Sequence, residues 1–431
     1  MDFNKREHIS KVLKKKDNSK ALVAGWAQKI KLMGNLAFID LRDRTGTLQI
    51  VAKGFSDLNR ITPESVISAS GVIKKGQKKS GEKELILKSY ELINKAETPL
   101  PIDLVQNTTY IDKRLDNRFL DIRNPKVSAI FKIRSEIFRN IVDFFSKEGF
   151  IKINTPKITS SGVESGSELF EIKYFNKKAY LSQSPQIYKQ MMVAAGFEKV
   201  YEIGPVFRAE KSHTTRHLTE FTGIDMEMGF INDENDVMDI VENLMKYIIK
   251  NVINNCKDEL KLLNIKLEIP KRIPRLKIEE IKLMLGKEGK NLGKDDDLDA
   301  ESEKLIYNII KKKYNCDFVF ATNYPWNKRP FYHMIPENDK SGTKSFDLIF
   351  NGVEIATGAQ REHRYNILKQ QAKEKGINLD EIKGYADIFR FGCPPHGGVG
   401  LGLDRIVQCM LKLENVRESI LLPRDPERLT P

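Results

Sequence analysis

The chain has 431 residues, of which 40% are hydrophobic and 30% are charged. It is too long for one ordinary domain, and its apolar content excludes an intrinsically disordered chain. Lys and Arg number 72 against 59 Asp and Glu, which gives a formal charge of +13. Such an excess indicates a polyanionic partner, either a nucleic acid or an anionic membrane, although a protein with a general Lys bias would show it too.

The cysteines and the N-terminus bear on the compartment. The four cysteines lie far apart and form no Cys-x-x-Cys pair. The sequence therefore predicts neither a zinc ribbon nor a disulfide framework, and a reducing cytoplasm fits. The N-terminus is polar and charged, and no long apolar run occurs elsewhere. We expect a cytoplasmic protein without an export signal, a membrane span or a membrane partner.

The first hundred residues have the pattern of short strands separated by turns. Between residues 21 and 96, five runs are apolar or alternate with polar residues, and turn sequences such as DRTG at 43–46 separate them. Five strands in that length predict a small β-barrel, which we place at residues 1–100. Five-stranded barrels of the oligonucleotide-binding (OB) type bind single-stranded nucleic acid through aromatic side chains and basic loops.

One aromatic residue of this region is a candidate for stacking on a base. Phe38 lies on a predicted strand, Arg42 follows it, and Gln49 lies on the next strand. An exposed aromatic ring beside Arg and Gln could stack on one base while they contact its edge. The alternative is that Phe38 belongs to the barrel core, and the sequence leaves both possibilities open.

The pattern of predicted secondary structure changes after the barrel. A proline-containing stretch at residues 101–125 is predicted to be a linker or hinge. The run SAIFKIRSEIFRNIVDFFSKEGF has apolar residues at helical spacing and ends at Gly149, which predicts a long amphipathic helix. Strands and helices then mix through a second domain at 126–431, which contains a helix-rich, Lys-rich insertion at about 233–315.

The segment FRAEKSHTTRHLTEF, residues 207–221, combines many charges with apolar edges. A solvated surface would not need its Phe and Leu residues, and a buried strand would not tolerate its charges without partners. The combination predicts the wall of a cleft that receives an anion.

Three segments then point to a family. FIKINTPKI at 150–158, FRAE…RHLTEF at 207–221 and GLGLDR at 400–405 occur in this order. They resemble the three signature motifs of class II aminoacyl-tRNA synthetases, and LDNRFLDIR at 115–123 together with the barrel is similar to the aspartate, asparagine and lysine subgroup. Over essentially the whole chain, the likeness is to its compact archaeal-type aspartyl enzymes. The resemblance implies an α+β catalytic domain built on an antiparallel sheet, preceded by a five-stranded OB-fold barrel.

The family's reaction explains the cleft. An amino-acid carboxylate attacks the α-phosphate of ATP, so two anions must meet, and positioning and charge neutralisation do most of the work. Arg208 resembles the second-motif arginine, which would bind both anions, and Arg405 resembles the third-motif arginine, which would hold the γ-phosphate. These two are the expected catalytic residues. The residues expected to bind ATP are Arg208, Glu210, Arg216, His217, Leu218, Phe221, Glu354, Gly402 and Arg405.

The stretch FDLIFNGVEIATGAQRE at 346–362 suggests a magnesium site. Asp347 and Glu354 lie seven residues apart, as two strands joined by a turn would allow, and Thr357 adds a hydroxyl. Such hard oxygen ligands suit Mg²⁺ that bridges phosphates. Related enzymes carry Ser in place of this Thr, which keeps the oxygen.

The choice of amino acid is expected from LSQSPQIYKQ at 181–190, which resembles the QSPQ signature of aspartyl enzymes. Lys189 and Arg361 would grip the substrate's side-chain carboxylate from two sides, which favours aspartate over asparagine. A neutral amide there would leave a buried lysine unpaired, at a cost of about 1–3 kcal/mol. The residues expected around aspartate are Glu164, Ser184, Gln186, Lys189, Arg208, Thr357 and Arg361.

The resemblance also implies two macromolecular partners. The barrel would hold the tRNA anticodon through Phe38, Arg42, Gln49 and Gln28, and a second copy of the chain would dimerise around Pro156. Some relatives that accept only one tRNA carry an aromatic residue in place of Gln28. Ligation of L-aspartate to tRNA(Asp) through an aspartyl-adenylate is therefore expected, and charging of tRNA(Asn) as well stays open.

Two alternatives remain from the sequence. The chain could be an asparaginyl-tRNA synthetase, or it could be a tRNA-binding paralogue without catalysis. Such a paralogue should have lost Arg208, Glu354 or Arg405, and the sequence keeps all three.

Overall fold

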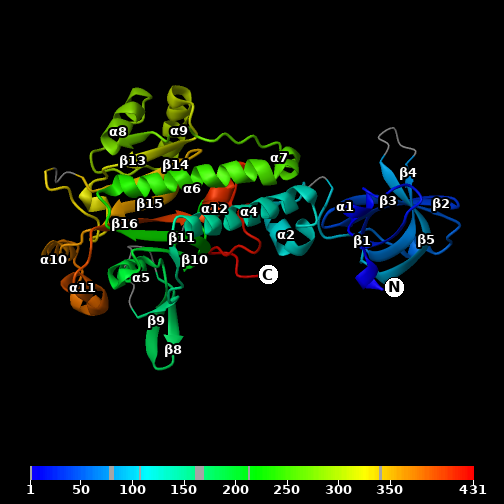
Figure 1. Ribbon diagram of the computed structural model, residues 1–431, viewed down its shortest axis with the longest axis horizontal. Coiled ribbons are helices and arrows are strands. Elements are labelled where there is room, and N and C mark those ends of the chain that lie inside the picture. The colour runs from blue at the N-terminus through cyan, green and yellow to red at the C-terminus, as the bar shows by residue number, and fades with distance from the viewer. Residues whose placement is uncertain (1, 77–81, 106–107, 161–168, 212–213, 339–341) are drawn as a thin grey trace. The chain divides into compact units, whose positions relative to one another are not determined.

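The computed structural model describes residues 2–76, 82–105, 108–160, 169–211, 214–338 and 342–431. It divides the chain into two compact units, Met1–Asp103 and Leu104–Pro431 (Figure 1). Within the described part of the chain, no helix has the length and the apolar character that crossing a membrane requires.

The first unit is the predicted barrel, which is confirmed as closed and five-stranded. Its strands, with the short helix α1 (Ile9–Val12) beside them, follow the spatial order β1-β2-β3-β5-β4. Alternation along β2 buries Ala37, Ile39 and Leu41 in the core and leaves the ring of Phe38 outside it. The strands are β1 (Lys20–Met33), β2 (Leu36–Asp43), β3 (Gly46–Lys53), β4 (Val66–Lys75) and β5 (Lys83–Asn94).

The second unit begins with helices. Two short helices, α2 (Ile111–Asp116) and α3 (Arg118–Asp121), precede the long helix α4 (Pro125–Lys147). The side chain of Asn124 caps α4 by accepting a hydrogen bond from the backbone N–H of Lys126, and a proline fills the first helical position. Ile133, Ile137 and Ile141 recur at helical spacing and bury one face of α4 in the core.

An eight-stranded sheet organises the rest of the second unit. All neighbouring pairs are antiparallel except β12 with β13 and β10 with β6. This sheet confirms the α+β class that the motifs implied. In spatial order its strands are β12 (Arg275–Lys277), β13 (Phe318–Thr322), β14 (Ser345–Phe350), β15 (Val353–Gln360), β16 (His396–Gly402), β11 (Glu220–Gly229), β10 (Lys199–Phe207) and β6 (Ile151–Lys152).

One face of the sheet carries the main hydrophobic core. Helix α4 and the helices of the segment around 233–315 share this core with the sheet, and β12 extends the sheet itself (Figure 1). The segment predicted as an insertion is thus part of the main hydrophobic core of the second unit. Its helices are α6 (Glu234–Asn255), α7 (Lys257–Leu263), α8 (Ile278–Lys287) and α9 (Ala300–Tyr314), and α12 (Leu403–Leu411) packs beside them.

Smaller elements complete the second unit. A three-stranded sheet has the order β7 (Ile158–Thr159), β9 (Lys177–Leu181) and β8 (Glu171–Tyr174). Helix α5 (Gln186–Met192) contacts β10 and β11. It also packs on a second apolar cluster built by α10 (Tyr365–Glu374) and α11 (Lys383–Arg390).

Candidate active site

A cavity of about 280 Å³ lies on the face of the large sheet opposite the main core. Strand β11 shows why the two faces differ. Ile224 and Met226 point into the core, whereas Phe221, Gly223 and Asp225, one residue out of phase, line the cavity. Asp225 pairs with Gly400 on β16, and Gly400 pairs with Thr357 on β15. The cavity floor is therefore three strands in register.

The connection between β10 and β11 supplies one wall of the cavity. Arg208 follows β10, and its guanidinium lies 5.3 Å from the centre of the Phe221 ring. Its NH1 is 3.9 Å from Oε1 of Glu210. Its Nε is buried and has no hydrogen-bond partner among the described residues. The Arg208 side chain as a whole is 41% exposed, so a partly exposed guanidinium with an unused donor faces the cavity and can take an anionic ligand.

A second pair of arginines lies at the same end of the cavity. Arg216 donates through NH1 to Oε2 of Glu303 at 2.9 Å and through NH2 to the backbone oxygen of Gly352 at 2.5 Å. Arg405 donates through NH1 to the backbone oxygen of Glu354 at 2.9 Å. Because Arg405 gives this NH1 hydrogen to a neutral carbonyl, its charge stays available to phosphates.

Other residues that were expected to bind ATP also line the cavity. His217 accepts or donates a 2.6 Å hydrogen bond between Nδ1 and Oγ1 of Thr214, and burial together with the charge of Arg405 lowers its pKa. A mostly neutral imidazole can hydrogen-bond a phosphate oxygen without adding charge. Glu210, Leu218 and Gly402 also lie on the cavity wall.

The expected metal ligands occupy neighbouring strands β14 and β15. Asp347 pairs with Thr357 across them, and Oγ1 of Thr357 donates to Oε1 of Glu354 at 3.0 Å. Burial, and next the charge of Asp347, raises the pKa of Glu354. Two carboxylates that repel each other beside a hydroxyl fit a hard divalent cation. Among the residues that the structure describes, no group of three or more His, Cys, Asp and Glu side chains is placed to hold a metal ion.

Asp347 has a partner that the sequence did not suggest. Arg329 donates through NH2 to Oδ2 of Asp347 at 2.6 Å, and its guanidinium stacks 3.8 Å from the Tyr324 ring centre. Oδ1 of Asp347 is buried and has no partner among the residues the structure describes. One oxygen of Asp347 is thus held by Arg329, and the other remains free for a cation.

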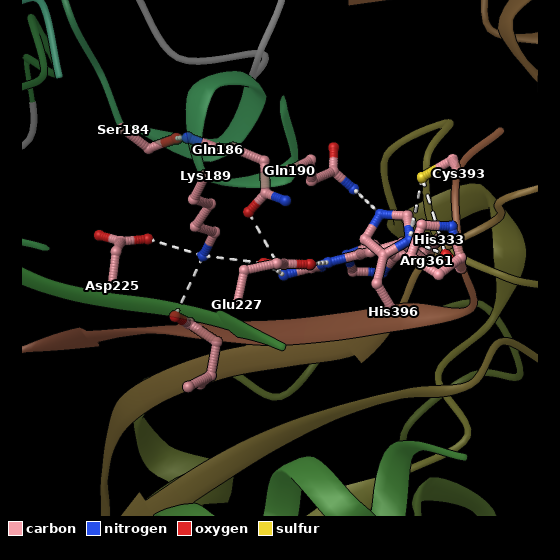
Figure 2. A network of polar contacts seen from close by, with 12 residues as sticks. Ser184, Gln186, Lys189, Gln190, Asp225, Glu227, His333, Arg361, Cys393 and His396 are labelled. Carbon is pink, nitrogen blue, oxygen red and sulfur yellow. Dashed lines mark hydrogen bonds and ion pairs between the residues drawn. The ribbon is translucent and has the colours of Figure 1, made fainter. Parts of the chain in front are cut away.

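The opposite end of the cavity is a buried network of charges, shown in Figure 2. Lys189, on α5, is 1% exposed. Its Nζ lies 2.8 Å from Oδ1 of Asp225 and 3.5 Å from Oε2 of Glu227, and it donates to the backbone oxygen of Val399 at 3.1 Å. Lys189 does not line the cavity itself but binds Asp225, which does.

Arg361 forms the other half of this network and lines the cavity (Figure 2). Its Nε donates to Oε1 of Glu227 at 2.9 Å, and its NH2 donates to Oε1 of Gln186 at 3.3 Å. Its NH1 lies 3.0 Å from Nε2 of His333. Lys189 and Arg361 thus come together as expected, but the carboxylate they share in this structure is Glu227 of the chain itself.

The glycines around residue 400 have a more specific role than close approach to a nucleotide. A Cβ atom on Gly398 would lie 2.1 Å from Oε2 of Glu227 and 2.2 Å from the backbone oxygen of Met226. No rotation of a larger residue avoids a backbone oxygen at that distance. Gly398 therefore makes room for the carboxylate that joins Lys189 to Arg361.

Two buried histidines border the network. Burial, followed by the charge of Arg361, holds the pKa of His333 well below its ordinary value. Burial also lowers the pKa of His396 to about 4. His396 contacts Nε2 of Gln190 at 3.1 Å through its own Nε2. Both rings are therefore neutral near pH 7, and they add no positive charge to that of Lys189 and Arg361.

The remaining residues expected around aspartate divide into two groups. Ser184 and Gln186 line the cavity, and the backbone N–H of Gln186 donates to Oγ of Ser184 at 3.2 Å. Glu164 lies in the stretch 161–168, which is outside the described residues.

Two family models match the chain. The model for class II tRNA synthetases (D, K and N) matches residues 110–426, and the model for the OB-fold nucleic acid binding domain matches residues 21–93. The chain belongs to the class II tRNA synthetases. All three motif segments of this synthetase fall within the first match.

Relatives resemble this synthetase along its whole length. The Aspartate--tRNA(Asp) ligase of Pyrococcus abyssi is 44% identical over 99% of this chain and 100% of its own. The Aspartate--tRNA(Asp/Asn) ligase of Archaeoglobus fulgidus is 41% identical over 99% of this chain and 100% of its own. A solved asparaginyl-tRNA synthetase from Pyrococcus horikoshii, complexed with asparaginyl-adenylate, has a TM-score of 0.92 at 31% identity and covers 99% of each chain.

The barrel of this synthetase carries an open groove of about 670 Å³. Phe38 lies in it, two residues along β2 from Asp40, whose Oδ1 accepts a 3.3 Å hydrogen bond from Gln49. The ring, an amide and four lysines meet on one surface, which suits a stacked base and its phosphates. The lysines are Lys29, Lys31, Lys74 and Lys75.

Two residues that were expected to bind the anticodon do not line this groove. Arg42 is buried, and its two terminal nitrogens donate to Glu64 at 3.2 and 2.7 Å. It therefore stabilises the barrel and is not part of the groove surface, because a buried, paired guanidinium cannot also face a nucleic acid. Gln28 is half-buried at a register shift of β1 between Ala27 and Lys29, and it does not line the groove.

The sequence pattern of β11 indicates two carboxylates of the buried network that the motifs did not. In FTGIDMEMG, residues 221–229, Asp225 and Glu227 alternate with the apolar Ile224 and Met226. Such a period of two predicts carboxylates on the cavity face of the strand. Glu303, Arg329 and His333 carried no such signal, because only the tertiary fold brings them to the cavity.

Proposed function

We propose that the chain joins L-aspartate to tRNA(Asp) through an aspartyl-adenylate, with ATP as co-substrate. The observation that carries the proposal is the buried network of Lys189, Arg361, Asp225 and Glu227. The network itself holds two cations and two carboxylates, and Arg208 at the reacting end adds a third cation. Aspartate carries one net negative charge and balances this excess, whereas asparagine carries none and would leave a buried cation unpaired.

The amino acid would lie between these groups. Arg361 faces its side-chain carboxylate, Lys189 supports that contact through Glu227 and Asp225, and Asp225 offers an acceptor for the substrate ammonium. The α-carboxylate then points toward Arg208. Discrimination of this kind relies on leaving a buried charge unpaired, which is the strongest means of rejecting an uncharged analogue.

Activation follows from bringing two anions together. Arg208 would bind the α-carboxylate and the α-phosphate at once, since its planar fork suits two oxygen pairs. Phe221 would stack on one face of adenine and Arg405 would cover the other, with its charge near the γ-phosphate. Because Arg208 is held beside Phe221 before ATP arrives, little reorganisation is needed in the transition state.

Glu354, Thr357 and Asp347 would hold Mg²⁺ at the phosphate end. The ion would supply charge neutralisation to the phosphate oxygens. Arg329 orients Asp347 for this task by binding one of its oxygens.

The barrel groove is the proposed site for the anticodon. Phe38 would stack on a base, and the lysines around it would contact phosphates. Aspartate--tRNA(Asp/Asn) ligases occur among the relatives, so the chain is also a candidate to charge tRNA(Asn). That choice would depend on the lysines of the groove edge and on Gln28, which lies outside the groove but directly precedes its residue Lys29.

We further propose a homodimer around the first motif. Pro156 is exposed, and Ile151 and Ile158 beside it are 44% and 47% exposed. Apolar residues at a sheet edge favour association with a second copy through a two-fold axis. Sedimentation equilibrium of the wild-type chain and an Ile158→Asp variant tests this: the wild type should sediment as a dimer and the variant as a monomer.

Pyrophosphate exchange is the experiment that tests the function. The purified chain with ATP and Mg²⁺ should exchange labelled pyrophosphate when aspartate is present and at least about 100-fold more slowly with asparagine. Charging of purified tRNA(Asp) and tRNA(Asn) then decides the nucleic-acid partner. Exchange with asparagine alone would identify an asparaginyl enzyme, and no exchange with either amino acid would identify a tRNA-binding paralogue.

A further inference from the structure

Helix α9 brings a carboxylate to the phosphate end of the cavity from outside all three motifs. Glu303 lies in the first turn of this helix and is only 7% exposed. Its Oε2 accepts two hydrogen bonds of 2.9 Å, one from NH1 of Arg216 and one from the backbone N–H of Glu354. One oxygen thus joins α9, strand β15 and the connection between β10 and β11.

The backbone around this contact is closely packed. Gly352, in the turn between β14 and β15, has φ +76°, and a Cβ there would lie 3.0 Å from Cα of Lys304. The turn can press against α9 because it carries no side chain at this position. The backbone oxygen of the same glycine accepts from NH2 of Arg216. Both terminal nitrogens of Arg216 are therefore held where α9 meets the turn between β14 and β15.

With these two contacts made, Arg216 still has donors with which to bind a phosphate. A guanidinium has five N–H donors, and Glu303 and Gly352 use two of them. Arg216 lines the cavity together with Glu354 and Arg405. Because a free arginine side chain must give up several rotamers on binding, a guanidinium fixed in advance binds a phosphate with a smaller entropic cost.

The local charges agree with a paired role for Glu303. Burial raises its pKa to about 7, and Arg216 is the largest influence in the opposite direction. A carboxylate in such surroundings is costly unless a cation accompanies it. Arg216 is such a cation, with NH1 2.9 Å from Oε2 of Glu303.

We propose that Glu303 is a positioning residue for ATP, which holds the Arg216 guanidinium at the phosphate end of the cavity before the nucleotide arrives. This inference rests on the proposed function, since it assigns Arg216 to the polyphosphate of ATP. It gives the helix-rich segment a direct part in nucleotide binding.

The test is aspartate-dependent pyrophosphate exchange by the full-length chain, measured as separate KM values for ATP and aspartate. Glu303→Ala should raise the KM for ATP about tenfold or more, and should leave kcat and the KM for aspartate within about twofold. Glu303→Gln keeps an acceptor oxygen and should restore the KM for ATP to within about threefold. Glu301→Ala, an exposed carboxylate on the same helix, is the matched control and should change nothing.

A double variant separates positioning from general stability. In an Arg216→Ala background, adding Glu303→Ala should have no further effect on the KM for ATP, because the residue through which it acts is gone. If Glu303→Ala does not fold, Glu303→Asp, which is one methylene shorter, should raise the KM for ATP where Glu303→Gln does not. Equal rises in both KM values, additive effects, or failure of Gln to restore would overturn the proposal. Exchange by the wild type decides the proposed function separately.

Discussion

The catalytic cavity and the barrel groove solve different recognition problems. At the amino-acid end of the cavity, Lys189 and Arg361 are 1% and 2% exposed and are fixed by carboxylates of the chain itself. In the groove, Phe38 is half-buried and its lysine neighbours are mostly exposed. A buried network of this kind suits the selection of one small molecule by its charge, whereas an open groove suits an extended polyanion, bound by stacking and screened attraction.

The buried charges of the network depend on one another, because removing any one of them leaves a buried partner unpaired. Each cation of the network has a carboxylate partner, so the empty pocket is nearly balanced before substrate enters. The four lysines that line the groove are exposed, so substitutions of these lysines should have nearly independent effects. The two regions should therefore respond differently to single substitutions.

Lys189→Met should give the largest effect. It removes a buried ammonium from two carboxylates, Asp225 and Glu227, which should lower the free energy of unfolding by about 3–5 kcal/mol. Aspartate-dependent exchange should fall by at least about 100-fold in kcat/KM. Lys178→Met, at an exposed lysine, is the control, and denaturant unfolding with the exchange assay measures both effects. Wild-type stability in the Met variant would contradict the network.

His396→Gln should show a pH-dependent effect of intermediate size. The pKa of His396 is about 4 in the fold and about 6.5 when unfolded, so the unfolded chain binds the proton first as pH falls. The wild type therefore loses stability between pH 6.5 and 4 that the variant keeps. The difference in unfolding free energy between the two should shift by about 3 kcal/mol across this window.

Chemical denaturation at several pH values measures this shift. A constant difference between wild type and His396→Gln across this window would contradict a lowered pKa for His396 in the fold. Exchange activity at pH 7.5 should stay within about twofold, since the ring borders the network without lining the cavity.

Phe38→Leu should give the smallest effect and should affect the second assay alone. Loss of one stacked base costs about 1–3 kcal/mol, so the KM for tRNA(Asp) in charging should rise about 5- to 150-fold. Pyrophosphate exchange, which needs no tRNA, should not change. Phe3→Leu removes another exposed ring, outside the groove, and should leave charging as it was. Equal charging by both variants would remove the groove from the account.

Local patterns in the sequence predicted much of the fold and several of the residues that line the cavity. Period-two strands gave the barrel, and the three ordered motifs gave the antiparallel sheet and brought Arg208, Phe221 and Arg405 into one cavity. Each of these depends on residues near one another in the chain or on a motif of fixed spacing. Alternation along β11 also indicates Asp225 and Glu227, but these two residues lie outside the three motifs.

Contacts between distant segments were not predictable in the same way. Glu303 reaches Arg216 across 87 residues, and Arg329 reaches Asp347 from outside its strand pair. Arg42 looked suited to the groove because it follows Phe38, yet Glu64 holds it in the barrel. Sequence spacing says which face a side chain takes, but the partner on that face is decided by how the elements pack.

The most direct test uses Arg361→Gln and the ratio of kcat/KM for aspartate to that for asparagine in pyrophosphate exchange. Both substrates meet the same folded fraction, so this ratio does not depend on stability. We expect this ratio to fall at least about 100-fold below that of the wild type, because the guanidinium proposed to face the substrate carboxylate is lost. A ratio equal to that of the wild type would contradict the claim that this buried network selects aspartate.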